Sequence, residues 1–386
     1  MQTDVDVVVV GAGPVGLMLA LGLARRQVRV LVLEKAPATA EHSRAPAIWP
    51  ATQELFLKLG VLEKFLRAGI VLPELRLWDT DHNRALLHLP IEELKDETPC
   101  PQMLVIPQST TERLLLEEVS ATSTGEVRFS SEVTAIEQDA SGVDVLYEDG
   151  SGNARVQARF VAGCDGAGSM VRETLGGSLE GTTYGVEAAL ADVAIQDYDD
   201  LPFPRMTTRP ALAMAIRIDA SLWRLILPFV PGREKRSLDD RIRDAVHHLF
   251  PEVAYEHVWK SEFRLHRRVS SRWMDRRVVL AGDAAHLNSP VGGQGMNAGM
   301  MDAARLTDAL MDALAQDDCK PLEAYVAHRR KKIEKGVNRF TDVMTRLILG
   351  GGGRLMRPVL RIASVVLRVR PLRRRFLRRL ALLDSA

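Results

Sequence analysis

The segment that most constrains the fold is the start of the chain. Residues 5–10 form an apolar, β-branched run typical of a buried strand, and the sequence GAGPVG follows at residues 11–16. Residues 17–24 have helical composition, and a second apolar run at residues 28–33 ends in Glu34. A strand, a glycine turn, a helix and a strand closed by an acid together specify a βαβ unit that binds a dinucleotide. The sequence therefore predicts an α/β chain that begins with a Rossmann-like domain.

The glycine turn has a physical role in such a unit. Gly11 allows a tight turn, Gly13 lets the backbone approach a pyrophosphate, and Gly16 lets the helix pack closely. The helix N-terminus presents free N–H groups to the phosphates. Glu34 is placed to accept hydrogen bonds from both ribose hydroxyls, and an acid there disfavours a 2′-phosphate, which leaves NAD or FAD. The candidate contacts are Gly11, Ala12, Gly13, Pro14, Val15, Gly16, Glu34 and Lys35.

A second glycine-rich segment, VAGCDGAGSMVR, occupies residues 161–172. It reads as a strand end that opens through glycines into a helix capped by Ser169. Asp165 is placed to orient the backbone, and Arg172 is a candidate countercharge for a phosphate. A purely structural turn from strand to helix is the alternative.

The third and most specific segment follows a buried strand at residues 277–281. It reads GDAAH at residues 282–286 and PVGGQGMNAG at residues 290–299. With these three motifs in this order, the chain resembles the single-component FAD-dependent monooxygenases, the aromatic-hydroxylase family of para-hydroxybenzoate hydroxylase. The resemblance covers residues 4 to about 330 and implies FAD as the cofactor.

The resemblance also implies roles for individual residues. Asp165 and Gly166 would lie near the FAD pyrophosphate, and Asp283 would hydrogen-bond the ribityl hydroxyls. The glycine loop would lay N–H groups along the isoalloxazine edge, and the helix after it would direct its dipole at the flavin, where negative charge gathers on reduction. The backbone of Pro290 would lie close to the reactive flavin carbon. The loop residues implied are Pro290, Gly293, Gln294, Gly295, Met296 and Asn297.

Three single residues match the family less specifically. Arg44 lies in a loop that, by resemblance, sends an arginine to the FAD phosphates, but it reads equally well as a surface charge. Gln108 matches a glutamine near the ribityl chain, although it is also placed to start a helix. Val133 matches a strand whose backbone contacts the adenine.

The family's chemistry defines the expected reaction. The resemblance implies that NADH or NADPH reduces FAD, and that O2 then forms a flavin C4a-hydroperoxide that hydroxylates a phenolic, quinone-precursor or polyketide-type ring. One alternative is a flavin-dependent halogenase, whose Trp-x-Trp pair is represented here by Trp223 alone. Another is a flavin-binding reductase or accessory protein without oxygenase activity, although neither a second GxGxxG unit nor a CxxC pair occurs.

No catalytic acid or base stands out in the sequence. His286 reads as a structural histidine beside the flavin loop. Five residues on the expected substrate sheet are pocket candidates, although each taken singly fits a packing or surface role better: Tyr184, Arg217, Trp223, Arg224 and His266.

Strand signals predict how the chain divides. Short alternating strands within residues 126–161 predict an antiparallel meander, and Pro-interrupted strands within residues 182–273 predict a second α+β domain on a mixed or antiparallel sheet. We expect three parts: an FAD-binding domain of residues 1–75, 101–180 and 274–345, a substrate domain of residues 76–100 and 181–273, and basic C-terminal helices of residues 346–386.

The near-neutral charge of the chain conceals a basic end. In total, 51 basic residues face 50 acidic ones, but residues 354–386 hold ten arginines and one acid, so this tail carries +9 and the remainder −8. Apolar residues recur in the tail at helical spacing. Its arginines are open to three interpretations: pairing with the acidic body, peripheral contact with anionic lipid, or nucleic-acid binding, which the scarcity of interleaved aromatic residues disfavours.

The cysteines and the hydropathy pattern bear on the compartment. Cys100, Cys164 and Cys319 lie far apart, which favours a reducing compartment over disulfides or a zinc site, so no metal is expected. No room for a signal peptide precedes residue 5, and no run of eighteen apolar residues occurs. We expect a cytoplasmic protein, with attachment at the inner face of the membrane as the alternative for the tail. The oligomeric state is not predicted.

Overall fold

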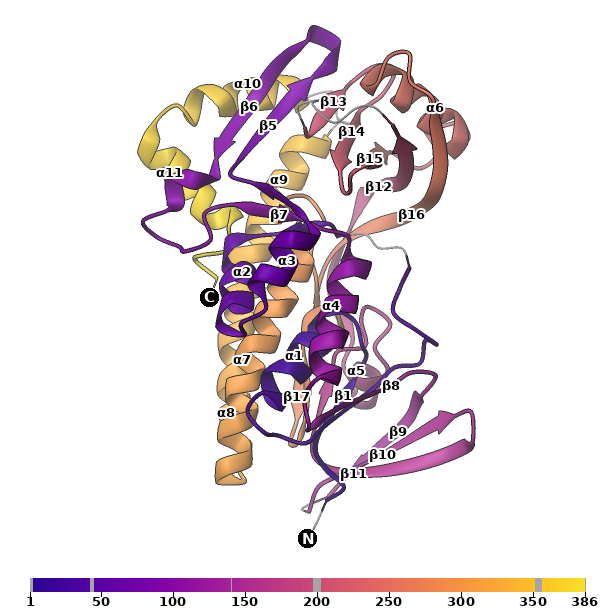
Figure 1. The fold of residues 1–386 in the computed structure, drawn as a ribbon, viewed down its shortest axis with the longest axis vertical. Helices are drawn as coiled ribbons and strands as arrows, with labels where there is room; N and C mark the ends of the chain where they lie inside the picture. The colour runs from indigo at the N-terminus through magenta and orange to yellow at the C-terminus, as the bar shows by residue number, and fades with distance from the viewer. Residues whose placement is uncertain (1–2, 42–44, 140, 197–202, 351–355, 386) are drawn as a thin grey trace.

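The computed structural model describes residues 3–41, 45–139, 141–196, 203–350 and 356–385. Two large sheets lie one above the other along the long axis of Figure 1, the first in the lower half and the second in the upper half. A small three-stranded sheet, β3-β7-β4, completes the described strands. The predicted α/β class, with a Rossmann-like domain, a second domain on another sheet and a helical C-terminal region, is confirmed.

The first sheet has a parallel centre that carries the glycine motifs. Its strands are β1 (Val5–Val10), β2 (Val30–Leu33), β8 (Gly125–Arg128), β11 (Gly152–Gly163), β17 (Met274–Asp275) and β18 (Val278–Leu280). They lie in the order β17-β18-β11-β1-β2-β8, and all neighbours except β17 and β18 run parallel. Val7 and Val9 pack into the core on one face of β1, whereas Val8 and Val10 pack into the core on the other. Burial on both faces explains why β1 is nearly continuous in apolar residues.

Helices cover one face of this sheet, and the predicted meander extends it. The helices and strands of this part are α1 (Pro14–Ala24), α2 (Pro50–Lys58), α3 (Leu62–Ala68), α4 (Gln108–Ser120), α5 (Met170–Thr174), α7 (Gly295–Gln316), α8 (Lys320–Lys332), β3 (Ala47–Ile48), β4 (Ile70–Leu72), β7 (Met103–Val105), β9 (Glu132–Gln138) and β10 (Val143–Asp149). The pairs β9–β10 and β10–β11 are antiparallel, as predicted. Helix α7 packs along α1, which brings the first and third motifs together.

The second sheet is mixed and mostly antiparallel. Its order is β19-β16-β12-β15-β14-β13-β5-β6, in which only β13 and β5 pair in parallel. The bounds are β5 (Glu74–Asp79), β6 (Arg84–Pro90), β12 (Leu179–Ile195), β13 (Arg205–Thr207), β14 (Ala213–Arg217), β15 (Leu222–Phe229), β16 (Tyr255–Ser270) and β19 (His286–Leu287). Helix α6 (Leu238–Leu249) covers one face, where Trp223 and Leu225 pack against Ile242 and Val246.

The domain boundaries follow from sheet membership. Strands β5 and β6 join the second sheet although they precede much of the first sheet in sequence. We propose the expected division of the chain on this basis, with the FAD-binding domain interrupted twice by segments of the substrate domain.

Helices form the C-terminal region. They are α9 (Asn338–Leu349), α10 (Met356–Val366) and α11 (Arg370–Leu380), and short helical turns elsewhere span Thr80–His82, Ile91–Leu94, Gly282–Ala284 and Ile333–Val337. Helix α9 ends just before Gly350, and the glycines at residues 351–353 lie outside the described residues. Helix α10 packs on β6 and α11 packs on the turn Ile91–Leu94.

The described residues contain neither a membrane-spanning helix nor a cluster of metal-binding side chains. None of the described helices combines the length and apolar character needed to cross a membrane. Within the same part of the chain, no group of three or more His, Cys, Asp or Glu side chains is arranged to hold a metal ion.

Candidate active site

The three motifs meet at one edge of the first sheet. Strands β18, β11, β1 and β2 are neighbours, and their carboxyl ends lead into Asp283, Asp165, the glycine turn and Glu34. Backbone hydrogen bonds tie these ends together, from Gly11 N to Leu33 O at 2.8 Å and from Cys164 N to Val10 O at 2.8 Å. Ligands of open α/β sheets bind outside the carboxyl ends of the strands, so this edge is the candidate site.

The glycines of the first turn differ in what surrounds them. Gly11 has φ +103°, and a Cβ there would lie 2.6 Å from the carbonyl oxygen of Cys164. A Cβ on Gly16 would lie 1.9 Å from the carbonyl oxygen of Gly11. A Cβ on Gly13 would meet nothing within 4 Å. Gly11 and Gly16 are therefore needed for packing, whereas Gly13 keeps space open at the N-terminus of α1, which no side chain caps.

Glu34 holds the glycine turn as well as facing the site. Its carboxylate accepts hydrogen bonds from Ala12 N at 2.7 Å and Ala36 N at 2.9 Å. Each carboxylate oxygen has a second lone pair, so both can still accept from ribose hydroxyls. Lys35 is exposed beside it, and Arg44 lies outside the described residues.

The second motif is more structural than predicted. Asp165 accepts hydrogen bonds from the Ser169 hydroxyl at 2.6 Å and from Val171 N at 3.1 Å, so it helps cap α5, while Ser169 caps it as predicted. The expectation that Arg172 offers a phosphate countercharge is wrong. Its guanidinium is buried and donates to the carbonyls of Ala284 and Ala167, which binds the second motif to the third. Gly166 has φ +77° with open space around it.

Val15 joins the first motif to the third. A Cβ on Gly282 would lie 2.9 Å from Val15 Cγ2, and a Cβ on Gly299 would lie 2.6 Å from the same atom. Gly299 thus allows α7 to pack closely on α1, and Gly282 allows the turn at residues 282–284 to do the same. The neighbouring Asp283 side chain is exposed at this edge of the sheet.

The loop before α7 is held by its own side chains. Asn297 Nδ2 donates to Ala47 O and Gly293 O, and its Oδ1 accepts from Trp49 N at 2.8 Å. Gln294 Nε2 donates to Arg379 O at 2.8 Å. These two side chains fix the loop, so a flavin contact from either would come from its backbone. Gly292 and Gly293 have φ of +94° and +62°, Pro290 is exposed, and Met296 packs partly into the core.

A buried charge network supports the third motif, and no sequence pattern indicated it. Asp302 on α7 accepts from Arg329 Nε at 2.7 Å and from Gly282 N at 3.1 Å, and it lies 2.6 Å from His286 Nε2. Burial alone would raise the pKa of Asp302, but Arg329 and His286 reverse this and hold it below its ordinary value. The structural reading of His286 agrees with its burial beside this carboxylate.

Two residues that match the family less specifically, Gln108 and Val133, lie on elements that cover or extend the first sheet. Gln108 begins α4 and donates to Glu112 at 2.7 Å. Burial raises the pKa of Glu112, and Glu34 adds to this rise. Val133 lies in β9 with its side chain in the core, so only its backbone is available to a ligand.

The comparisons with known proteins agree with this geometry. The family model described as an FAD binding domain matches residues 4–340. The chain is also 32% identical over 355 residues to 6-hydroxy-3-succinoylpyridine 3-monooxygenase HspB of Pseudomonas putida, which covers 90% of both proteins. The chain belongs to the single-component FAD-dependent aromatic monooxygenases. The resemblance seen in the sequence is thereby confirmed.

Solved structures of the family share the whole fold. The p-nitrophenol 4-monooxygenase PnpA of Pseudomonas putida superposes with a TM-score of 0.89 at 25% identity, covering 99% of both chains. The anhydrotetracycline hydroxylase OxyS of Streptomyces rimosus gives a TM-score of 0.82 at 30% identity, covering 98% of this chain and 76% of that one.

The residues at the sheet edge fit FAD, the cofactor of the family. The open space at Gly13 and the uncapped helix N-terminus suit a pyrophosphate, and Glu34 suits a ribose. The exposed Asp283 and the backbone of the glycine loop lie further along the same edge.

On the second sheet, two of the five pocket candidates are structural. Arg224 and Asp192 form a buried bidentate pair across β15 and β12 at 2.8 and 2.7 Å. Trp223 is buried beneath α6, where its ring meets that of Phe250 edge to face with 4.8 Å between the ring centroids. For these two residues the structure agrees with the alternative interpretation, that they are packing residues.

The other three candidates are more exposed. Arg217 donates to the carbonyls of Asp219 and Ala220 in its own turn. His266 lies 3.0 Å from Thr183 Oγ1, and burial together with Arg268 and Arg264 lowers its pKa. The Tyr184 hydroxyl donates to Asp342 at 2.8 Å, and burial with this carboxylate raises the pKa of Tyr184 to about 12.

An apolar cluster lies between the second sheet and the C-terminal helices. It includes buried side chains from β5, β6, β13 and α10. Tyr184 of β12 packs against it, as does Val291 in the loop of residues 288–294, which we call the flavin loop. The cluster therefore borders the loop that precedes α7. Its buried members are Leu77, Leu86, Ala188, Met206, Leu212, Leu265, Leu349, Met356 and Leu360.

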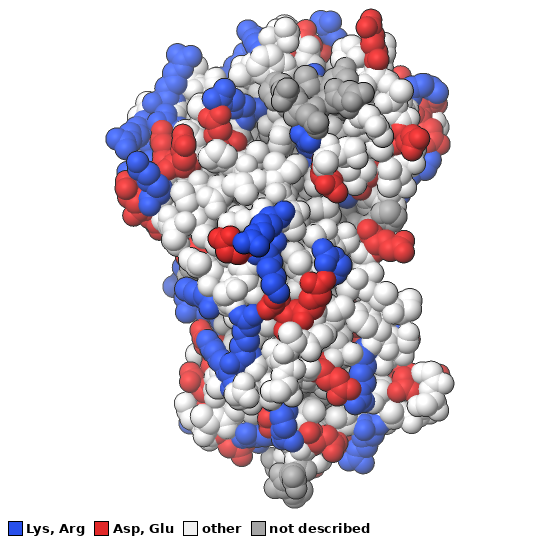
Figure 2. Space-filling model, viewed as in Figure 1, with Lys and Arg blue, Asp and Glu red and all other residues white. Residues whose placement is uncertain are grey.

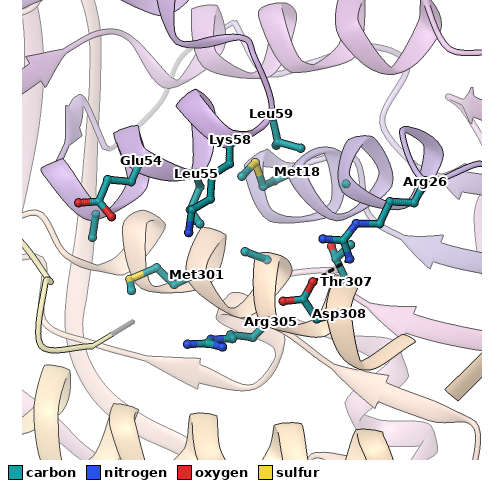
Figure 3. Close-up of a pocket in the computed structure, with 13 residues that line it drawn as sticks. Met18, Arg26, Glu54, Leu55, Lys58, Leu59, Met301, Arg305, Thr307 and Asp308 are labelled. Carbon is teal, nitrogen blue, oxygen red and sulfur yellow. Dashed lines mark hydrogen bonds and ion pairs between the residues drawn. The ribbon is translucent and has the colours of Figure 1, made fainter. Parts of the chain in front are cut away.

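A separate pocket of about 220 Å³ lies between α1, α2 and α7 (Figure 3). Apolar side chains such as Met18, Leu55 and Met301 line it, and the Arg26–Asp308 ion pair at 2.7 Å stands at its edge. None of the predicted cofactor residues lines this pocket. It is therefore distinct from the edge where the motifs meet.

Proposed function

We propose that this protein uses NADH or NADPH and O2 to hydroxylate a phenolic or related aromatic ring. The observation that carries the proposal is the meeting of three flavin motifs at the carboxyl ends of four neighbouring strands. Relatives named for hydroxylation of a pyridine, a nitrophenol and a tetracycline ring support an aromatic substrate. Bound FAD supplies hydride acceptance and oxygen activation.

The cofactor would be held mainly by backbone groups. The N–H groups at the N-terminus of α1 would meet the pyrophosphate, and Glu34 would accept from the ribose hydroxyls. Asp283 would accept from the ribityl chain, and the N–H groups of residues 291–297 would lie along the ring. The N-terminal end of α7 would stabilise negative charge on the part of the flavin ring nearest to it. Arg44, Gln108, Val133, Asp165 and Gly166 would complete the contacts.

The substrate side would be built by apolar side chains. The cluster beside Val291 excludes water, which favours an apolar ring and protects oxygen chemistry from solvent. Because the pKa of Tyr184 is about 12, its hydroxyl stays protonated at neutral pH. Its one hydroxyl proton is donated to Asp342, so Tyr184 would offer a substrate only its acceptor oxygen, and we assign no general base.

Turnover with a panel of phenols, hydroxypyridines and polycyclic aromatics tests the proposal. Anaerobic reduction of the bound flavin by NADH or NADPH should accelerate when a substrate is present, and the product should gain one oxygen atom from labelled O2. A flavin that no nicotinamide reduces would contradict the proposal. Reduction without oxygen incorporation would indicate a reductase, and halide incorporation would indicate a halogenase.

A further inference from the structure

The turn between α10 and α11 exposes a stripe of apolar side chains. Ile362, Val365, Val366, Val369 and Leu372 are 66%, 59%, 44%, 50% and 47% exposed. Ile362, Val365 and Val366 share one face of α10, and Val369 follows in the turn just before α11. Five of the ten large exposed hydrophobic side chains in the described part of the chain thus fall within eleven positions. Isolated exposed apolar residues are ordinary in proteins, whereas such a concentration marks an interaction surface.

Packing on the body does not account for this stripe. The faces of the same segment that pack on the body are occupied by Met356, Leu360, Leu367, Leu377 and Leu380, all of which are buried. A helix that served only to cover the body would carry polar residues outside. Here the outer face is apolar as well.

The arginines of the tail divide into two groups. Those turned to the body form ion pairs: Arg357 with Asp79 and Asp81, Arg373 with Glu93, Arg374 with Glu97, and Arg378 with Glu97 and Asp384. The others are exposed and have no carboxylate partner among the described residues: Arg361, Arg368, Arg370, Arg375 and Arg379. Pairing with the acidic body therefore accounts for part of the basic tail only.

The exposed arginines border the apolar stripe. Arg361 and Arg368 are four and three residues from Val365, and Arg375 and Arg379 share a helix face with Leu372. Figure 2 shows basic side chains gathered at the upper left, where Figure 1 places α10 and α11. We call the five exposed apolar residues of the stripe, together with the five exposed arginines, the tail patch. It combines apolar side chains with a rim of positive charge that no described carboxylate neutralises.

We propose that the tail patch docks the protein on the surface of an anionic phospholipid bilayer. The apolar side chains would enter the boundary between headgroups and acyl chains, and the guanidinium groups would bind lipid phosphates. A symmetric contact with a second copy would bring two sets of five arginines together, and like charges at an interface are repulsive. The charge of the patch thus favours an anionic occupant over the same surface of another copy.

Flotation of the full-length holoprotein with vesicles tests this proposal independently of the reaction. Vesicles of phosphatidylcholine with about 30 mol% phosphatidylglycerol should carry the protein at low salt, whereas pure phosphatidylcholine vesicles should not. Val365→Ser with Val369→Ser, or Arg368→Gln with Arg370→Gln, should each lower the partition coefficient about tenfold. The matched control is Leu57→Ser with Val258→Ser, which removes side chains of 48% and 46% exposure outside the patch and should leave flotation unchanged.

The outcomes separate lipid docking from self-association of the protein. Unchanged FAD content and thermal stability would show that the patch variants are folded, as expected for exposed positions. Absence of flotation, or equal flotation of every variant, would overturn the proposal. Self-association in sedimentation velocity that the patch substitutions abolish, without vesicle binding, would overturn it too and assign the patch to a second copy.

Discussion

At the carboxyl edge of the first sheet, close backbone contacts bring segments together, whereas in the second sheet a buried pair of charged side chains joins two neighbouring strands. The first edge depends on Gly11, Gly16 and Gly282, whose missing Cβ atoms allow segments to touch. The second sheet depends on Arg224 and Asp192, which bind each other with side chains only 3% and 4% exposed. A site built from backbone can hold the same cofactor throughout a family, while a sheet built from side chains can vary its pocket.

The sharpest test of this contrast lies between two glycines of one turn. Gly16→Val should prevent folding, because its Cβ would lie 1.9 Å from the Gly11 carbonyl oxygen. Gly13→Val should fold but lose FAD, because its side chain would enter only the open space that we assign to the pyrophosphate. Soluble yield, thermal unfolding and flavin content measure both effects. Normal flavin content in Gly13→Val would show that the cofactor lies elsewhere.

Breaking the buried pair tests the second sheet. Arg224→Met should destabilise the fold by about 3–5 kcal/mol, because it leaves the Asp192 carboxylate buried without its partner. The double variant with Asp192→Leu is the control and should regain most of that loss. Denaturant unfolding gives both values. If the single variant were as stable as the double variant, the pair would not organise the sheet.

Asp283→Ala tests the carboxylate that we assign to the ribityl chain. Loss of a charge-assisted hydrogen bond of about 1.5–3 kcal/mol should weaken FAD binding about tenfold to a hundredfold. The apoprotein should remain folded, because Asp283 is exposed. Asp312→Ala, at an exposed aspartate further along α7, is the matched control. Flavin titration that gives equal affinity for both variants would remove Asp283 from the site.

The smallest expected effect concerns the tail. Burial alone would raise the pKa of Glu97, but hydrogen bonds from Arg374 and Arg378 hold it below its ordinary value of 4.5. The stabilisation is therefore present above that value and is lost as the pH falls through the lowered pKa. Glu97→Gln should cost about 1 kcal/mol at neutral pH and nothing in strong acid. Unfolding free energies at several pH values measure this, and a difference that grows in acid would contradict it.

The sequence was sufficient wherever the structure depends on local backbone geometry. Three features were predictable: the glycine turn, the turn at Gly282 and Asp283, which we call the Gly-Asp turn, and the meander. Glycines, β-branched runs and turn residues specify conformation within a few positions. Even their convergence followed, since carboxyl ends of parallel strands share one edge. The residues themselves left NAD or FAD, and the resemblance of the three motifs to the aromatic hydroxylases implied FAD and the family.

The partners of buried charged side chains could not be predicted. Asp302 joins His286 and Arg329 across 16 and 27 residues, and Arg172 reaches Ala284 across 112 residues. No periodicity connects such positions, because the contacts exist only after the sheets and helices have packed. For the same reason Arg224 resembled a pocket residue until its cross-strand partner was known.

The contacts of the last described residues have a consequence for the order in which the protein matures. Arg329, which holds Asp302 beneath the Gly-Asp turn, donates to the carbonyl oxygen of Ser385 at 2.7 Å, and Gln294 donates to that of Leu380. A ribosome makes the glycine turn of residues 11–16 first and these partners hundreds of residues later. Domains begin to fold during synthesis, so the nascent chain can shape the phosphate end of the site early. The flavin loop reaches its final arrangement only after residue 385 has left the ribosome.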